Sequence, residues 1–393
     1  MNENVKKSTA KTLGELLKNE MKENPKFYLF SPDETTSNKL DATYDVTSRA
    51  WSNLEIKPQD LKEADGGRIV ELLSENVLFS VMLGHLLNHE PAMMTSYESF
   101  FTIIASQIVQ HLKFIEQSEQ VSWRKPYPAV NLLSTSTCWR QDHNGFSHQS
   151  PMLISALLDR PGKNVNCFFP VDSKSMRVVY DFMLKSENVV NLTTFNKTEE
   201  PQYLDDLHAE YQLNFGASIF GFASDGDTFN LESETNHFDF IFTAAGDIAT
   251  REALAAMALV RAELPEIKLR FINILSLTHN YIGTTEHQMT PEIFDKLFTV
   301  HTPIIANFHG YKDTLKNILR NYTTTKIFAH GFEEKGSTTT PLQMLTLNHA
   351  SRFDLAIDVF NQLNRQDLVL KYQRLIDENR AYAQAHGIDS IEL

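Results

Sequence analysis

The sequence is short of cysteine, of positive charge and of long apolar runs, and each shortage excludes a class of protein. Its two cysteines, Cys138 and Cys167, form neither a CxxC pair nor a set with zinc-ligand spacing, which excludes a disulfide framework and a structural zinc site. Lys and Arg total 36 against 50 Asp and Glu, and this net charge of -14 argues against a nucleic-acid or membrane-surface binder. No apolar run approaches the roughly 20 residues that span a bilayer, and residues 1–12 lack the apolar core of a signal peptide. We therefore expect a soluble protein of the cytoplasm.

The remaining composition is that of an ordinary globular chain, with 42% hydrophobic and 22% charged residues. Apolar runs typical of strands alternate along it with amphipathic helices, which predicts an α/β fold made of two successive, mainly parallel-sheet domains. The expected strands cover residues 26–30, 68–72, 129–134, 165–169, 189–195, 238–244, 269–275, 303–308 and 326–330. We place the first domain at residues 10–205, a polar inter-domain segment at 206–236 and the second domain at 237–393.

Three polar turns follow strands of the first predicted domain. They cover residues 31–39, 74–75 and 138–149. Because ligands of open parallel sheets bind at the carboxyl ends of the strands, we expect these turns to share one crevice. The richest of them reads WRQDHNGFSHQ (139–149) and gathers many hydrogen-bond donors and acceptors around an Asn-Gly turn. Taken alone, it is equally consistent with a polar surface turn.

Other polar and aromatic residues have ordinary structural explanations. Glu75 stands where a strand hands over to a helix, and a carboxylate in the first turn of a helix is favoured by the helix dipole. Tyr97 and Phe100 are expected to head a helix whose apolar residues pack in the core. His85 and His89 have a spacing that could hold a metal, but no third ligand lies nearby in the sequence, so we assign no metal site.

Taken together, and in this order, several segments resemble the carboxyl half of bacterial phosphoketolases. These are thiamine-diphosphate enzymes of the transketolase-like superfamily that split xylulose 5-phosphate or fructose 6-phosphate with inorganic phosphate, giving acetyl phosphate and an aldose phosphate. The matching segments are FSPDETTSNKL (30–40), GRIVELLSE (67–75), TSYESF (95–100), LLSTSTCWRQDHNGFSHQ (132–149), KLRFINILSL (268–277), NFHGY (307–311) and EKGSTTTP (334–341). The resemblance implies a thiamine pyrimidine-binding domain followed by a transketolase C-terminal-like domain.

The resemblance also implies roles for individual residues. Glu75 matches the carboxyl group that shares a proton with the cofactor pyrimidine, and Phe100 matches the ring that stacks on it. Partial burial would tune the pKa of this carboxyl group, and the apolar neighbours of Glu75 would permit it: Ile69, Val70, Leu72, Leu73 and Val77. His148 and Asn144 match residues that face the reacting carbons, where proton transfer is needed. Tyr97 matches a residue beside the intermediate, and the matched candidates for holding phosphate are Ser37, Lys39, His143 and Lys197.

The same comparison implies that the chain lacks the half that holds the cofactor diphosphate and Mg. We therefore expect a separately encoded amino-terminal half as partner, and an oligomer, such as a dimer, in which the two halves complete the site. The chain departs from the family at Asn76, at residues 88–92, at Glu119 and around Lys197. These departures leave two alternatives open: a non-catalytic truncated remnant or regulatory subunit, and an enzyme with an altered ketose or acyl donor.

Overall fold

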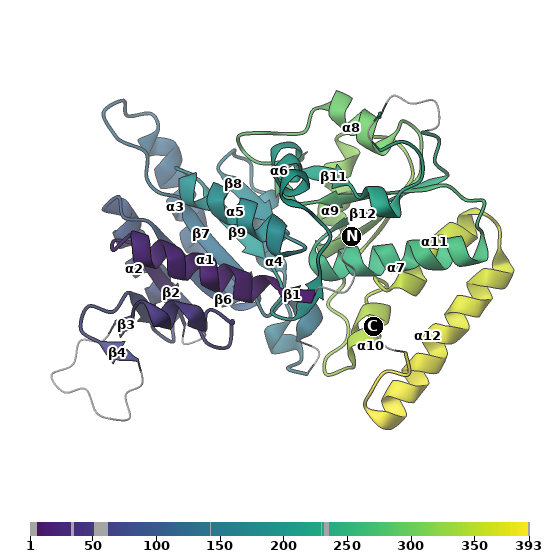
Figure 1. Cartoon of the computed structure of the whole chain (residues 1–393), viewed down its shortest axis with the longest axis horizontal. Helices are drawn as coiled ribbons and strands as arrows, with labels where there is room; N and C mark the ends of the chain where they lie inside the picture. Colours follow the sequence, from purple (N-terminus) through teal and green to yellow (C-terminus); the bar gives the residue numbers. More distant parts are fainter. Residues whose placement is uncertain are drawn as a thin grey trace. The chain divides into compact units, whose positions relative to one another are not determined.

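The computed structural model describes residues 6–32, 35–50, 62–141, 143–228, 230–231 and 236–391 (Figure 1). The chain divides into two compact units, which we call the N-terminal unit and the C-terminal unit. The first comprises Met1–Ser136 and Gly162–Glu210, and the second comprises Thr137–Pro161 and Tyr211–Leu393. The segment that contains WRQDHNGFSHQ thus groups with the C-terminal unit, although it precedes residue 205. The proposed domain limits at 205 and 237 stay a prediction.

The N-terminal unit is built on a parallel sheet with the strand order β8-β9-β7-β6-β2-β5-β3-β4. Its strands are β2 Tyr28–Ser31, β3 Arg49–Ala50, β4 Glu63–Ala64, β5 Ile69–Glu71, β6 Ala92–Tyr97, β7 Val130–Thr135, β8 Val165–Phe168 and β9 Val190–Thr194. The central strands are almost wholly buried, as expected for a parallel sheet covered on both faces. A separate antiparallel pair joins β1 Lys6–Ser8 to β10 Glu199–Pro201.

Helices follow the strands of this unit in the pattern that the sequence predicts. They are α1 Thr9–Glu23, α2 Glu75–Leu87, α3 Ala105–Ser118 and α5 Ser173–Lys185, with short 3-10 turns η1 Asp41–Asp45 and η2 Phe100–Ile104. The start of α1 is fixed by Ser8, whose side chain accepts a hydrogen bond from the Lys11 amide, and α5 starts with a capping box at Asp172. α1 packs against α5.

One expectation for this unit is wrong. Tyr97 does not head a helix: it is the last residue of β6, a strand between β7 and β2 that the sequence pattern did not reveal. The helix α2 ends at Leu87, and His89 takes a positive φ of 59° just before the chain enters β6. The residues AMMTSY lack a β-branched run, so burial on the sheet rather than local propensity makes this segment a strand.

The C-terminal unit carries a second sheet with the order β11-β13-β12-β16-β17. Its strands are β11 Ala217–Ile219, β12 Phe240–Ala245, β13 Leu269–Ile274, β16 Ile304–Tyr311 and β17 Ile327–Phe332; β14 Ser276–Thr278 and β15 Tyr281–Ile282 form an antiparallel pair. Only β11 runs antiparallel to its neighbour in the second sheet. The predicted fold class, α/β with mainly parallel sheets, is confirmed.

Helices of the C-terminal unit cover this sheet and close the chain. They are α4 Met152–Leu158, α7 Asp247–Glu263, α8 Pro291–Phe298, α9 Lys312–Arg320, α10 Pro341–Leu347, α11 Arg352–Gln362 and α12 Gln366–His386; α6 Asp206–Phe215 crosses the limit between the units. α11 packs on α7 and α12 (Figure 1). Within the described residues, no helix has the length and apolar character needed to cross a membrane.

Candidate functional site

Glu75 is the first residue of α2 and lies just beyond the carboxyl end of β5. Its side chain is half-buried, and the Ser96 hydroxyl near the end of β6 donates a hydrogen bond to Glu75 Oε1 at 3.4 Å. The partial burial expected for Glu75 is therefore present, and its apolar neighbours differ in exposure: Ile69 is fully buried, whereas Leu73 is 80% exposed and Val77 is 50% exposed. Leu73 precedes α2, and Val77 lies within it, one turn before Val81, which is also 50% exposed.

Four of the predicted residues meet beside the end of β6. The Ser37 hydroxyl lies 3.3 Å from the Tyr97 hydroxyl, and the Lys197 ammonium lies 4.8 Å from the centre of the Tyr97 ring. The Phe100 ring is stacked on Tyr97 at a centroid distance of 5.9 Å and an interplanar angle of 13°. A hydroxyl pair, a cation and two aromatic faces therefore come together, and Ser96 connects them to Glu75.

The turn that carries Ser37 is held by buried hydrogen bonds that the sequence did not predict. Asn38 is fully buried; its amide donates to Thr95 Oγ1 at 3.1 Å and accepts from Thr135 Oγ1 at 2.5 Å. Thr35 donates to Glu71 Oε1 at 2.7 Å. Three strands thus fix a single turn. The sequence shows polar residues at the ends of these strands, but it does not show which of them pair with the turn, because the partners are distant in sequence.

Lys39 does not join this group. It has a positive φ of 63° and its side chain is exposed. Within the part of the chain that the structure describes, that side chain makes no hydrogen bond or ion pair. Its role in holding phosphate stays a prediction.

The WRQDHNGFSHQ loop lies in the C-terminal unit and is organised around buried glutamines. Asn144 donates through Nδ2 to Gln141 Oε1 at 2.6 Å, and the Gln149 amide nitrogen donates to the Gln141 carbonyl at 2.8 Å. Gly145 has φ 72° and ψ -169°, a conformation that is essentially restricted to glycine. The predicted Asn-Gly turn is therefore present. Asp142 lies outside the described residues.

The histidines of this loop differ in their surroundings. His148 is half-buried in the short η4 turn, Phe146–His148, and its Nδ1 lies 2.8 Å from the Ser147 hydroxyl. His143 is exposed. His148, with a hydroxyl group at one ring nitrogen, has surroundings that suit proton transfer. His143, being exposed, is better suited to contact an anion.

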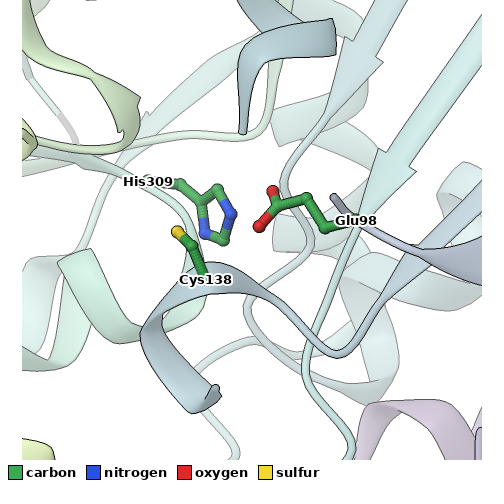
Figure 2. Close-up of side chains that lie close together, drawn as sticks. All are labelled: Glu98, Cys138 and His309. Atoms are coloured by element: carbon green, nitrogen blue, oxygen red, sulfur yellow. The ribbon is translucent and has the colours of Figure 1, made fainter. Parts of the chain in front are cut away.

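The loop starts from a rigid base in the core of the C-terminal unit. The Trp139 indole donates to the His309 carbonyl on β16 at 2.8 Å, and Trp139 packs edge-on against Phe332 at the end of β17. The Cys138 sulfur and a His309 ring nitrogen approach within 4.8 Å (Figure 2). Glu98, also labelled there, belongs to the N-terminal unit. A thiol and an imidazole are two potential ligands, fewer than the three or four that a zinc site uses, so we assign no metal to the pair.

The predicted residues thus form two groups. Glu75, Ser37, Tyr97, Phe100 and Lys197 belong to the N-terminal unit. Asn144, His148 and His143 belong to the C-terminal unit. The expectation that all three polar turns share one crevice crosses the two units and stays a prediction.

Comparison with known proteins supplies the family. The family model described as D-xylulose 5-phosphate/D-fructose 6-phosphate phosphoketolase matches residues 11–186, and the model of the C-terminal domain of the same family matches residues 197–393. A probable phosphoketolase of Thermosynechococcus vestitus is 35% identical over 99% of this chain and 48% of its own length. Probable phosphoketolase 1 of a Nostoc species is 37% identical over 99% of this chain and 49% of its own length.

Solved structures with the same fold are transketolases. A Pichia stipitis transketolase crystallised with xylulose 5-phosphate has a TM-score of 0.67 at 15% identity, covering 94% of this chain and 47% of that one. A split-gene transketolase described as an inactive β4 tetramer has a TM-score of 0.59 at 16% identity, covering 92% of this chain and 98% of that one. These likenesses show the fold alone.

These findings correct the prediction of a separately encoded partner. The chain spans about half the length of the curated relatives that it matches, and those relatives carry the other half in the same chain. The prediction of a separate amino-terminal half is therefore wrong. With two family models matching nearly all of its length and relatives at 35–37% identity, this chain belongs to the phosphoketolase family.

Proposed function

We propose that this chain forms the pyrimidine side of a thiamine-diphosphate site and the substrate loop of a phosphoketolase. The reaction is cleavage of xylulose 5-phosphate or fructose 6-phosphate with inorganic phosphate, giving acetyl phosphate and an aldose phosphate. The observation that carries the proposal is the placement of Glu75 as the first residue of α2, hydrogen-bonded to Ser96 beside the Tyr97–Phe100 pair. A half-buried carboxyl group beside two half-buried, stacked aromatic rings suits the donor set and the flat ring of an aminopyrimidine.

Each of these residues has a task when the cofactor is bound. The cofactor supplies a carbanion-stabilising thiazolium carbon. Glu75 shares a proton with the pyrimidine ring nitrogen, and Phe100 stacks on that ring. The cofactor's diphosphate and Mg fall to the portion of the longer relatives that this chain does not span.

Ser37, Tyr97 and Lys197 would bind the substrate. Ser37 and Tyr97 present hydroxyl groups 3.3 Å apart, and Lys197 adds a positive charge in a chain whose net charge is -14. Charge-assisted hydrogen bonds to phosphate are about twice as strong as neutral ones, so a local cation is what an acidic protein needs. Lys39 and His143, both exposed, are further phosphate contacts in this proposal.

Asn144 and His148 would move protons on the reacting carbons. Carbon-carbon cleavage, loss of water and capture by phosphate each require a proton to leave or arrive. His148 is half-buried, its Nδ1 lies 2.8 Å from the Ser147 hydroxyl, and an imidazole can both give and take a proton. Asn144 is oriented by Gln141 and keeps its amide oxygen for a substrate hydroxyl.

A second candidate function is a non-catalytic remnant or regulatory subunit, favoured by the departures from the family. The family resemblance implies an arginine in the segment that here covers residues 119–122, and this segment has none. Glu119, which caps the end of α3, accepts hydrogen bonds from Asn164 and Asn188 at 3.4 and 3.3 Å. Its carboxylate makes structural hydrogen bonds at the surface and cannot replace the positive charge of an arginine. A third possibility is an enzyme that keeps the thiamine chemistry but uses a different ketose or acyl donor.

We propose further that copies of this chain associate, as a dimer in the cytoplasm. Exposed apolar side chains in α2 and just before it support self-association: Leu73, Val77 and Val81. The split-gene transketolase of similar length is described as a tetramer. Sedimentation of the purified chain tests this: a concentration-independent monomer would contradict it.

The function is tested with a fused chain that joins the first half of the Nostoc relative to this chain. The purified fusion is incubated with thiamine diphosphate, Mg, phosphate and xylulose 5-phosphate, and acetyl phosphate is measured. The proposal expects phosphate-dependent product. A folded fusion that forms none from xylulose 5-phosphate, fructose 6-phosphate or unphosphorylated ketoses would support the remnant.

A further inference from the structure

The side chain of Gln149 is the feature of the candidate loop that the proposed reaction leaves unused. It is 4% exposed, so it is not available as a substrate contact on the surface. Its amide nitrogen carries two protons and donates both: to the Gln141 carbonyl at 2.8 Å and to the Ser337 carbonyl at 3.0 Å. One atom therefore ties the two ends of the loop together and ties the loop to the segment between β17 and α10.

This geometry can be met by few side chains. A carboxylate of the same shape has no donor for either carbonyl, and a shorter amide loses the reach to both. The Gln149 amide oxygen is buried without a hydrogen-bond partner among the described residues, and an unsatisfied buried acceptor is destabilising. The donor side of the amide is therefore what the position uses.

The connection continues from Gln149 to a proposed catalytic residue. Gln141, whose carbonyl Gln149 holds, is itself 4% exposed and accepts a hydrogen bond from Asn144 at 2.6 Å. The amide of Asn144 also donates to the Gln141 carbonyl at 3.2 Å. Fixing Gln141 thus fixes Asn144 through two contacts.

The segment after β17 holds the opposite side of the same loop. A Cβ built on Gly145 would lie 3.1 Å from the Ser337 hydroxyl and 3.7 Å from that of Thr338. Behind this segment, Asp389 accepts hydrogen bonds from Thr340 and from the Leu342 amide, which anchors the start of α10. The loop therefore rests on a support that is itself tied down.

We propose that Gln149 is a positioning residue that holds Gln141 and residues 143–148 in the arrangement that Asn144 and His148 need. It acts through Gln141 and does not touch substrate. This inference rests on the proposed function for its meaning in catalysis, but the structural claim concerns this chain alone.

The test measures amide hydrogen exchange in the full chain for three proteins. Gln149→Glu keeps the shape and removes both donors, and Gln149→Asn keeps an amide that is too short for both carbonyls. Gln384→Glu, at an exposed position of α12, is the control for the added charge. In both Gln149 variants we expect exchange at the amides of Asn144, His148 and Gln149 to rise about tenfold, the effect of losing two ordinary hydrogen bonds. Exchange in β12 and α7 should stay unchanged.

The proposal is overturned if both Gln149 variants exchange like the unmodified chain, or if exchange in the loop and in β12 rises by the same factor. In the fused chain described above, the positioning role further predicts a lower kcat with KM within about twofold, since substrate contacts remain. An inactive fusion would count against the proposed function, while the exchange measurement would still decide the role of Gln149.

Discussion

The Lys197 ammonium lies 4.8 Å from the centre of the Tyr97 ring, and the Ser37 hydroxyl lies 3.3 Å from the hydroxyl of the same tyrosine. The contact links the segment after β9 to the end of β6, two strands that β7 separates in the sheet. It fixes the position of a cation at the carboxyl edge, where ligands of parallel sheets bind.

Replacing this cation should weaken substrate binding more than it slows the reaction. For Lys197→Met in the fused chain, we expect KM for xylulose 5-phosphate to rise about tenfold, the value of one charge-assisted hydrogen bond. Lys113→Met, at an exposed position of α3, is the control. The measurement is the initial rate over a range of xylulose 5-phosphate concentrations. An unchanged KM would show that Lys197 does not contribute to phosphate binding.

Gly145 should tolerate no side chain. Its φ of 72° and ψ of -169° cost a non-glycine residue about 1–3 kcal/mol, and the added Cβ would meet Ser337. Gly145→Ala should therefore lower stability by an amount in this range, measured by urea unfolding. Gly84→Ala in α2 is the opposite case, because a Cβ there meets nothing within 4 Å, and it should stabilise by about 1 kcal/mol. Equal effects of the two substitutions would contradict this account.

The buried ion pair between Glu252 on α7 and Arg352 on α11 should dominate the acid stability of the C-terminal unit. Glu252 is fully buried and accepts hydrogen bonds from Arg352 Nε, Nη2 and the backbone amide at 2.7–3.0 Å. Burial alone would raise the pKa of Glu252, but the Arg352 guanidinium holds it below its ordinary value. A lowered pKa contributes stability above the unfolded pKa, and this contribution is lost as pH falls through the folded pKa.

Glu252→Gln should cost about 3–5 kcal/mol at neutral pH, because it leaves a buried guanidinium without its counter-charge. The same change at Glu263, at the exposed end of α7 beside Lys371, should cost less than about 1 kcal/mol. Unfolding free energies at several pH values test both. A Glu252→Gln protein with unchanged stability at neutral pH would contradict the assignment.

His349 should contribute stability of the opposite pH dependence. A hydrogen bond that the His349 ring donates to the Asp354 carboxylate raises the pKa of His349. Its contribution to stability is therefore present below the unfolded pKa of about 6.5 and is lost as pH rises through the raised folded pKa. The pair is partly exposed, so the effect should stay below about 1 kcal/mol.

His349→Asn is a suitable variant because His349 has a positive φ of 54°, which asparagine also adopts. It should remove the fall in stability that begins above the unfolded pKa of about 6.5, measured by thermal unfolding at a series of pH values. His386→Asn at the end of α12 is the control. A fall that persists in the His349 variant would assign it to another group.

Local patterns in the sequence predicted the fold class and nine of the strands, because buried parallel strands are apolar along their whole length: β2, β5, β7, β8, β9, β12, β13, β16 and β17. The strand β6 was not predicted, since AMMTSY has neither a run of β-branched residues nor an alternation of apolar and polar residues. Its burial depends on β2 and β7, which are distant in sequence. The sequence also did not predict that Leu73 and Val77 are exposed, because an apolar residue type alone does not show whether the rest of the chain covers it.

The candidate site shows the same limit. Motif matches identified Ser37, Tyr97, Phe100 and Lys197 one by one, and the structure brings them together. The residues that hold the two loops, Asn38 and Gln149, were not predicted. Their hydrogen bonds reach 97 and 188 residues along the chain, and no spacing rule covers such distances.

The central claim is that Glu75 is the carboxyl group that serves the cofactor pyrimidine. The most direct measurement is acetyl phosphate formation by the fused chain and by its Glu75→Gln variant, with Glu292→Gln in the exposed first turn of α8 as the matched control. We expect Glu75→Gln to reduce kcat by at least about 100-fold, the usual contribution of a positioned acid, with the fold intact by circular dichroism, and Glu292→Gln to leave it unchanged. A Glu75→Gln fusion that forms acetyl phosphate as fast as its parent would contradict the claim.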